Sequence, residues 1–167
     1  MSLELVTNRD NFKFLIYPVD YICQCIKTYG YFSPTEIFFL KLLINADDNI
    51  IEIGGNIGSH CIPLSKMNMK GKYFCFEPQL DIYKLLVTNI ALNCCDNVIP
   101  YMYALGTENK TIYYSDSIKL QYEKNRGAFR LPENNENNNG DHFLKIRNID
   151  YFDDIMLLDK INLIKID

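Results

Sequence analysis

A short apolar run that ends in a glycine-rich loop limits the fold of this chain more than any other feature. The run is NIIEI at residues 49–53, and the loop is GGNIG at residues 54–58. A run this short and apolar is typical of a buried parallel strand. Glycines let the backbone turn sharply and approach a ligand closely. We expect the loop to end a strand and open a helix, where α/β sheets bind their ligands.

Helices and strands are expected to alternate after residue 33. The pattern predicts helices at 34–44, 58–67 and 80–92, and strands at 49–53, 73–76 and 97–103. This alternation favours an α/β fold with a parallel sheet. Pro100 places the third strand at an edge of the sheet or shortens it. Further strands are expected near 111–115, 143–146 and 161–166, with a short helix over 150–158.

The chain length of 167 residues fits one main domain, expected at residues 33–167, with residues 1–32 as an N-terminal extension packing on it. The extension is expected to form a strand and a helix. Ser33, Pro34 and Glu36 have the spacing of a capping box at the start of the first main helix. The polar segment 133–141 is expected to be a flexible loop, because it has nothing to bury.

Composition excludes several classes of function. The net charge is −4, and the 17 basic residues are scattered, which argues against a nucleic-acid partner. The apolar run at 37–44 is too short to span a bilayer, and no signal peptide is visible, so we expect a cytoplasmic protein without a membrane partner. None of the six cysteines has C-x-x-C spacing, so we expect reduced, structural thiols and no metal site.

Two acids follow the first two predicted strands and point to a nucleotide-type cofactor. Glu52 stands two residues before Gly54, in a loop that lacks the G-x-G-x-x-G spacing of dinucleotide sites. A carboxylate there repels pyrophosphate but attracts the ammonium group of a methionine-bearing cofactor. Glu77 ends the second strand, where an acid accepts ribose hydroxyls, and Pro78 fixes the turn behind it. Asn56 suits a left-handed position in the loop.

Blander interpretations remain open for each feature. Two glycines between a strand and a helix are often only a tight turn, and an acid at a strand end is often only solvated. A nicotinamide dehydrogenase is a third possibility, which the glycine spacing disfavours. The two acids and the loop, in order on the expected elements, favour the methionine-bearing cofactor.

Several motifs resemble those of the FkbM-type methyltransferases. The segment 50–60 resembles their D-x-G-A-N-x-G motif, and the F-E-P at 76–78 resembles theirs. The segments 89–93, 104–106 and 164–167 are similar to N-x-A-L-N, A-L-G and the start of I-K-I-D-x-E-G, while 125–127 and 148–150 are looser matches. The resemblance covers roughly residues 30–167. Glu52 replaces the usual Asp, and Gly55 replaces the usual Ala.

The resemblance implies a Rossmann-like class I methyltransferase of three αβα layers around a mainly parallel sheet. It implies S-adenosylmethionine as cofactor and O-methylation of a hydroxyl on a sugar, glycan or small natural product. Glu52 is expected to hold the cofactor's amino group through water, Glu77 its ribose, and Ala104 its adenine. The full set of expected cofactor-binding residues is Glu52, Gly54, Gly55, Asn56, Gly58, Glu77, Pro78 and Ala104.

The sequence stops at Asp167, where the resembled family continues with further strands, so we expect the last strands of the sheet to be missing. Asp167 is expected to orient the acceptor or the sulfonium, and His60 is the candidate general base. The apolar strand at 163–166 is expected to be an exposed edge that pairs with a second copy of the chain. The alternative function is a truncated, non-catalytic chain that binds cofactor or acts through oligomerisation.

Overall fold

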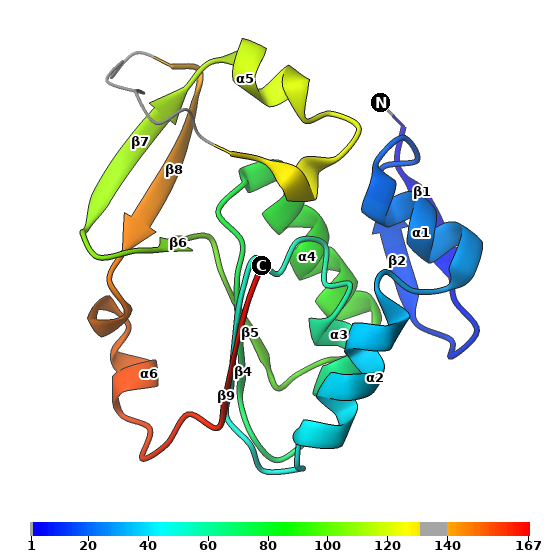
Figure 1. The fold of residues 1–167 in the computed structure, drawn as a ribbon, viewed down its shortest axis with the longest axis vertical. Coiled ribbons are helices and arrows are strands. Elements are labelled where there is room, and N and C mark those ends of the chain that lie inside the picture. Colours follow the sequence, from blue (N-terminus) through cyan, green and yellow to red (C-terminus); the bar gives the residue numbers. More distant parts are fainter. Residues whose placement is uncertain (1, 131–139) are drawn as a thin grey trace.

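A parallel sheet forms the centre of the protein. The computed structural model describes residues 2–130 and 140–167, so the predicted loop at 133–141 lies outside the described residues except for its last two positions. The strand order is β5-β4-β3-β9, and every pair is parallel. These strands are β3 (Ile50–Ile53), β4 (Tyr73–Phe76), β5 (Val98–Tyr101) and β9 (Leu163–Ile166) (Figure 1).

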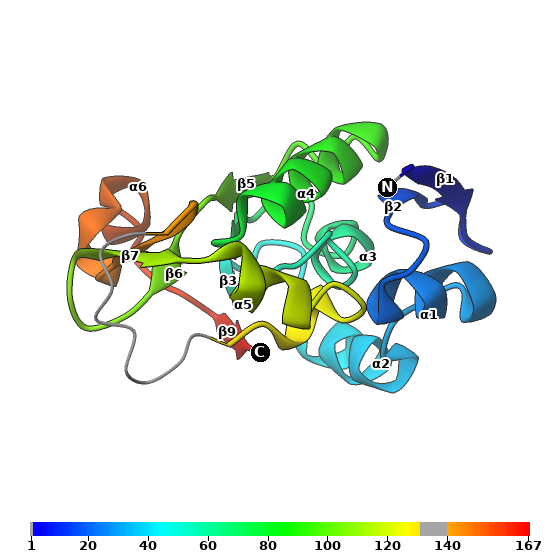
Figure 2. The same cartoon turned by 90° about the horizontal axis from the view of Figure 1, so that it is seen from above.

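Helices cover both faces of this sheet, but unequally. One face carries α2 (Pro34–Leu43), α3 (Cys61–Ser65) and α4 (Leu80–Leu92), and the other carries the short α6 (Asp153–Met156) after the 3-10 turn η2 (Ile149–Tyr151); Figures 1 and 2 show the two sides. Side chains alternate between these faces along each strand, as the pleat requires. Ile50 and Tyr73 join the larger core, while Ile51 and Phe74 join the smaller one. The predicted three-layer, Rossmann-like α/β fold is confirmed.

A second, smaller sheet lies on the α6 side. Its order is β6-β8-β7, from β6 (Ala104–Leu105), β7 (Lys110–Tyr114) and β8 (His142–Arg147). β7 and β8, which correspond to the strands predicted near 111–115 and 143–146, pair in an antiparallel arrangement. α5 (Asp116–Gln121) and the turn η1 (Arg126–Ala128) follow β7 and were not predicted.

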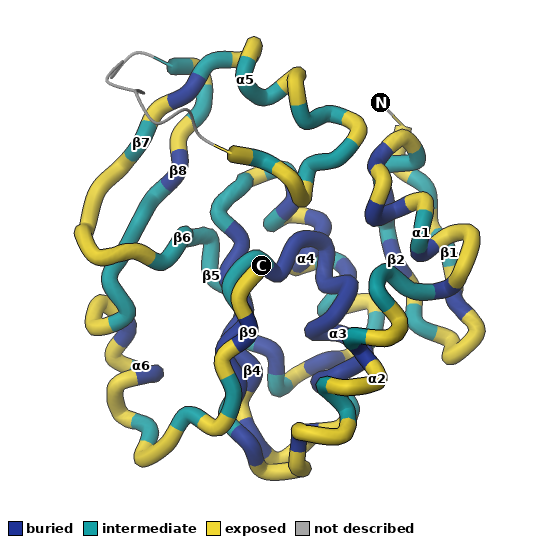
Figure 3. The backbone as a smooth tube through the Cα atoms, viewed as in Figure 1, coloured by how far each residue is buried: buried dark blue, intermediate teal, exposed yellow. Residues whose placement is uncertain are grey.

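The N-terminal unit packs against the outside of the α2–α4 layer. It consists of the hairpin β1 (Glu4–Thr7) and β2 (Lys13–Ile16) and the helix α1 (Tyr21–Tyr29), so it has one strand more than expected. Asn89 of α4 is fully buried; its side chain accepts from the Leu15 N–H at 2.6 Å and donates to the Ile57 carbonyl at 2.9 Å. One side chain therefore ties the hairpin to the glycine loop, and buried backbone continues across this junction (Figure 3).

Two local predictions were wrong for physical reasons. Ser33 precedes α2 with φ of 46°, and its side chain makes no capping hydrogen bond. The capping box therefore does not form, and Glu36 contacts His60 and Lys165 instead. α3 is shorter than the predicted 58–67, because Pro63 lies within it and has no N–H to donate to the preceding turn.

Other predictions agree with the structure. β4 and α4 have the predicted bounds, and β5 is an edge strand of the central sheet within the described residues, as Pro100 indicated. All six cysteines are free, although Cys94 is exposed. Across the described residues, no helix combines the length and apolarity that a membrane crossing requires.

Candidate functional site

The glycine loop after β3 folds over the end of β4. The N–H groups of Gly54 and Gly55 both donate to the Phe76 carbonyl, at 2.9 and 2.8 Å. Gly54 and Asn56 have φ values of 89° and 48°, so Asn56 adopts the left-handed conformation that its side chain tolerates. This turn directs the backbone of residues 54–58 to the carboxyl edge of the sheet, where parallel strands present ligands.

Gly55 is required by a close approach to β4. A Cβ added at Gly55 would lie 2.1 Å from the Cys75 Sγ atom, which is inside any allowed contact. The Cys75 thiol is fully buried, so it has little room to move. Glycine in place of the alanine of the resembled motif is thus explained by the sulfur beneath it.

Glu77 stands just beyond the end of β4 and holds the loop from the other side. Its carboxylate accepts from the backbone N–H of Asn56 at 3.1 Å and of Gln79 at 2.9 Å. Burial raises the pKa of Glu77 to about 7, although these two hydrogen bonds favour the charged form. A carboxylate has about four acceptor positions, so two remain for a ligand.

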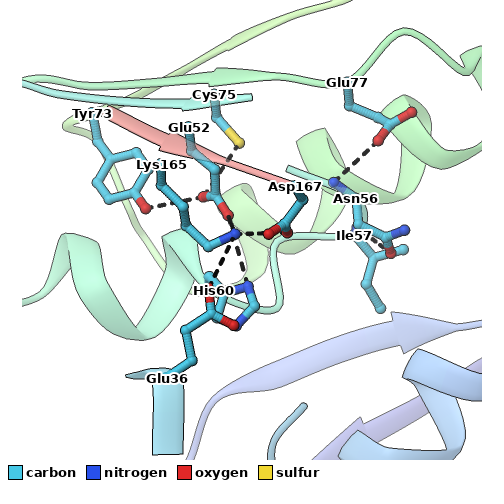
Figure 4. Close-up of polar contacts among 10 residues, drawn as sticks. All are labelled: Glu36, Glu52, Asn56, Ile57, His60, Tyr73, Cys75, Glu77, Lys165 and Asp167. Atoms are coloured by element: carbon cyan, nitrogen blue, oxygen red, sulfur yellow. Dashed lines mark hydrogen bonds and ion pairs between the residues drawn. The ribbon is translucent and has the colours of Figure 1, made fainter. Parts of the chain in front are cut away.

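Glu52 lies inside β3, and its carboxylate is closed off by neighbouring side chains (Figure 4). It is fully buried, accepts from the Tyr73 hydroxyl at 2.9 Å, and has the Lys165 Nζ atom 3.5 Å from Oε1. The His60 Nδ1 atom is 3.8 Å from the same oxygen. Burial raises the pKa of Glu52 to about 7, opposed by Lys165 and Tyr73.

Lys165 connects this buried acid to two exposed ones. Its Nζ atom lies 2.6 Å from Asp167 Oδ2 and 3.6 Å from Glu36 Oε1. Although burial lowers its pKa, the surrounding carboxylates raise it overall, so the ammonium keeps its charge. His60 lies 3.5 Å from Glu36, and burial, followed by the charge of Lys165, lowers the pKa of its ring. The neutral imidazole therefore adds no charge to this cluster.

Two adjoining cavities open at the carboxyl edge of the sheet. The larger holds about 390 Å³ and lies between the glycine loop, the N-terminal unit and η1. The smaller holds about 210 Å³ and lies against β6 and the end of β4. The residues that line both cavities are Gly54, Glu77, Gln79, Gly127 and Asp167. The larger volume alone is within the range of small-molecule sites.

The structure brings six of the predicted site residues to these cavities. Gly54, Asn56, Glu77 and Asp167 line the larger one, and Pro78 and Ala104 line the smaller one. The other four predicted site residues are buried behind the residues that line the cavities; they are Glu52, Gly55, Gly58 and His60.

His60 was expected to face the cleft, but its ring is 1% exposed and packs edge-on against Phe32. This placement corrects that expectation, and its role as general base stays a prediction. A direct approach to Glu52 is also blocked, so its contact with a cofactor through water remains a prediction.

Sequence reasoning missed the contribution of the N-terminal unit and of η1. Tyr21, Ile22 and Phe32 line the larger cavity. The Asp20 carboxylate accepts from the Arg126 N–H at 2.8 Å and thereby fixes η1 over the site. The looser N-x-G motif at 125–127 was the available signal, since Gly127 lines both cavities.

Potential metal ligands also meet here from separate elements, which spacing along the chain does not reveal. Within the described residues, one group is Glu52, Cys61 and Cys75, and another is Glu52, His60 and Asp167, with ligand atoms inside 4.8 Å of one another. In the second group, the Lys165 ammonium already lies beside both carboxylates.

Comparison with known proteins gives distant structural likenesses. No protein-family model matches the chain, and no curated protein sequence is similar to it. TYW2 from M. jannaschii, solved in complex with AdoMet, has a TM-score of 0.47 and 20% identity over 60% of this chain and 42% of its own. TYW2 from P. horikoshii, in complex with MeSAdo, has a TM-score of 0.44 and 20% identity over 59% of this chain and 35% of its own. A SAM-dependent O-methyltransferase from Thermotoga maritima has a TM-score of 0.41 and 21% identity over 59% of this chain and 40% of its own.

The chain thus spans less than half the length of these solved structures. At this level of sequence identity and structural similarity, the functions in the names of these proteins are not transferred to this chain. The assignment of function to this chain depends on its own site.

Proposed function

We propose that the chain binds S-adenosylmethionine in the two cavities and acts as a methyltransferase on a hydroxyl group of a sugar or small natural product. The observation that carries this proposal is the placement of Glu77. It is 3% exposed, lines both cavities, and is held by two backbone N–H groups between the glycine loop and the β6 wall. An acid in this position is suited to accept two ribose hydroxyls.

The residues of the two cavities fit the parts of this cofactor. The smaller cavity offers Tyr103, Phe129 and Ala104 as an apolar and aromatic wall for adenine. The larger one offers the backbone of Gly54 and the side chains of Asn56 and Ser59 to the methionine part. A Cβ at position 54 would lie 3.1 Å from the Asp167 Cβ atom, so glycine lets the loop approach Asp167 where both residues line the two cavities.

When bound, the cofactor supplies an electrophilic methyl group on a sulfonium. The chain's own residues bind and orient the reactants, which is the main requirement of a displacement reaction. Asp167 lines both cavities with its side chain 45% exposed, so it is the carboxylate placed to orient an acceptor hydroxyl. For His60 to act as general base, its ring must leave the buried cluster.

Calorimetric titration with S-adenosylmethionine tests the shared basis of the proposal. We expect saturable one-to-one binding, and the absence of binding would exclude the cofactor. NADH serves as the control ligand, because preferential NADH binding would favour a dehydrogenase. Mass spectrometry of hydroxylated acceptors incubated with the cofactor then reports methyl transfer, and binding without transfer to any acceptor would favour the non-catalytic alternative.

A further observation favours association between copies of the chain. β9 pairs only with β3 among the described strands, and Ile164 and Ile166, on the α6 side of the sheet, are 56% and 70% exposed. An edge strand with apolar side chains is a template for pairing. Sedimentation should therefore show a dimer or larger oligomer that Ile164→Lys weakens, whereas Leu157→Lys, just after α6, leaves it intact. A strictly monomeric wild-type chain would contradict this proposal.

A further inference from the structure

Every charged side chain that lines the two cavities is acidic. These side chains are Glu36, Glu77 and Asp167, and no lysine, arginine or histidine of the described residues lines either cavity. A third cavity above α4, by contrast, is lined by Lys119, Arg126 and His142 as well as by acids. The carboxyl edge of the central sheet therefore favours a ligand with positive charge.

The two cavities share part of their lining, here called the junction, and this part includes two acids. Asp167 lies beside Gly54 there, and Glu77 lines both cavities. In S-adenosylmethionine, the sulfur atom joins the methionine part to the adenosyl part. If the two parts occupy the two cavities, the sulfur lies at the junction, next to Asp167.

The acids beside the junction are not fully neutralised. Glu36, Glu52 and Asp167 share one ammonium group, that of Lys165, whose side chain is 5% exposed. Among the described residues, the buried Glu52 Oε1 atom accepts no hydrogen bond, and the Lys165 ammonium lies closest to Asp167, at 2.6 Å. Figure 4 shows the carboxyl groups of Glu52 and Asp167 and the side chain of Glu36 gathered around the Lys165 ammonium group. Negative charge therefore remains in excess where the sulfur is expected.

We propose that Glu36, in the wall of the larger cavity, and Asp167, at the junction, both held by Lys165, make the site selective for the positive charge of the sulfonium. The inference rests on the proposed function and extends it to regulation of the same site. Loss of the methyl group leaves an uncharged thioether, so the product S-adenosylhomocysteine forfeits this attraction. The site then binds its cofactor more tightly than its product, and Glu36 is a specificity-determining residue.

The test compares cofactor and product in matched variants by calorimetry. We expect the wild-type chain to bind S-adenosylmethionine about tenfold more tightly than S-adenosylhomocysteine, since one charge interaction in a partly buried site is worth roughly 1.4 kcal/mol. Glu36→Gln should weaken cofactor binding about fivefold and leave product binding within about twofold. Glu36→Asp should keep most of the preference, because it keeps the charge.

Glu108→Gln is the matched control. Glu108 is 71% exposed, lines neither cavity, and loses the same unit of charge when it is changed. It should behave as wild type with both ligands. Sinefungin, which carries an amine at the corresponding position, should group with the cofactor. The preference for cofactor over product should also shrink as salt is added.

The possible outcomes separate this inference from the proposed function. If neither ligand binds the wild-type chain, the proposed function fails. If both bind with equal affinity, or if Glu36→Gln weakens both equally, the function stands and the charge selectivity is overturned. Thermal unfolding of each variant shows whether Glu36→Gln remains folded. If it does not, the salt series on the wild-type chain takes its place as the test. A preference for cofactor over product that does not change with salt would then overturn the charge selectivity.

Discussion

The carboxyl ends of β3 and β4 carry one acid each, and the two acids have opposite surroundings. Glu52 and Glu77 are both buried, and the pKa of each is raised to about 7. Glu52 is enclosed by Tyr73 and Lys165, whereas Glu77 is held by backbone N–H groups and faces both cavities.

The difference follows from two positions in the chain. Glu52 lies within β3, one residue before the strand ends, so its side chain points into a layer of packed helices. Glu77 is the first residue after β4, where the chain leaves the sheet and side chains reach the ligand edge. In this protein, the acid before the strand end is therefore enclosed by side chains, and the acid after the strand end lines the cavities.

Removing the counter-charge of Glu52 should produce the largest effect. Lys165→Met leaves the buried Glu52 carboxylate without its cation, which destabilises a protein by up to about 3–5 kcal/mol while the carboxylate stays charged. Because the pKa of Glu52 is already about 7, the loss should grow as pH rises above 7, and denaturant unfolding on that side of neutrality measures it. The double variant Lys165→Met with Glu52→Gln should recover most of it, and a single variant as stable as wild type would show that Glu52 is not a structural ion-pair partner.

Changing the acid of β4 should instead act on binding. Glu77→Gln should lower the affinity for S-adenosylmethionine about 10- to 100-fold, the value of charge-assisted hydrogen bonds to a ligand. Glu52→Gln should lower it less than about threefold, because its carboxylate does not line the cavities. Calorimetry measures both affinities. An equal loss of affinity in both variants would support the water-mediated contact predicted for Glu52 and would contradict the difference in role between the two acids.

The contact between the two strand ends is tested at Gly55. Gly55→Ala forces a Cβ against the Cys75 sulfur, so we expect a loss of about 2 kcal/mol in the free energy of unfolding. Cys75→Ala removes that sulfur, and the double variant should be more stable than Gly55→Ala alone. A double-mutant cycle without coupling between the two positions would contradict the steric explanation.

The last effect is gradual and is expected in the pH dependence of stability. A carboxyl group with a folded-state pKa of about 7, against 4.5 in the unfolded chain, holds its proton longer when folded. Stability is therefore greatest below the lower value and decreases as pH rises towards 7, by at most about 1.4 kcal/mol per pH unit for each group.

Glu77→Gln should remove the contribution of Glu77 to this decrease of stability with pH. Urea unfolding across that pH window measures the effect, and a stability that increases with pH in wild type would be inconsistent with two raised carboxyl pKa values.

The alternation of strands and helices along residues 34–103 was predictable, because it depends on local pattern. The bounds of β4 and α4 followed from an unbroken apolar run and from apolar side chains on one helical face. Gly54, Asn56 and Glu77 were likewise predictable as ligand-edge residues, since a parallel sheet fixes where its strands end.

The remainder depends on contacts between distant parts of the chain. Glu36 has the spacing of a capping residue, yet β9 supplies Lys165 as its partner, and no local pattern reports that pairing. Tyr21 and Phe32 reach the larger cavity only because β2 docks on α4 through Asn89. Such long-range contacts override local preference, as the ion pair of Glu36 with Lys165 does.

The position of β9 beside β3 has a consequence for how the protein folds. Asn49 and Asn162, which are hydrogen-bonded at the start of these two strands, are 113 positions apart. Pairings this distant form late, because a long loop must close first. Lys165 arrives with β9, so until that strand docks, Glu52 has no cation and is better left hydrated. We therefore expect docking of β9 and dehydration of Glu52 to be one late kinetic step. This step should appear as a slow phase in refolding, and substitution of Lys165 or Glu52 should remove that phase before substitutions elsewhere do.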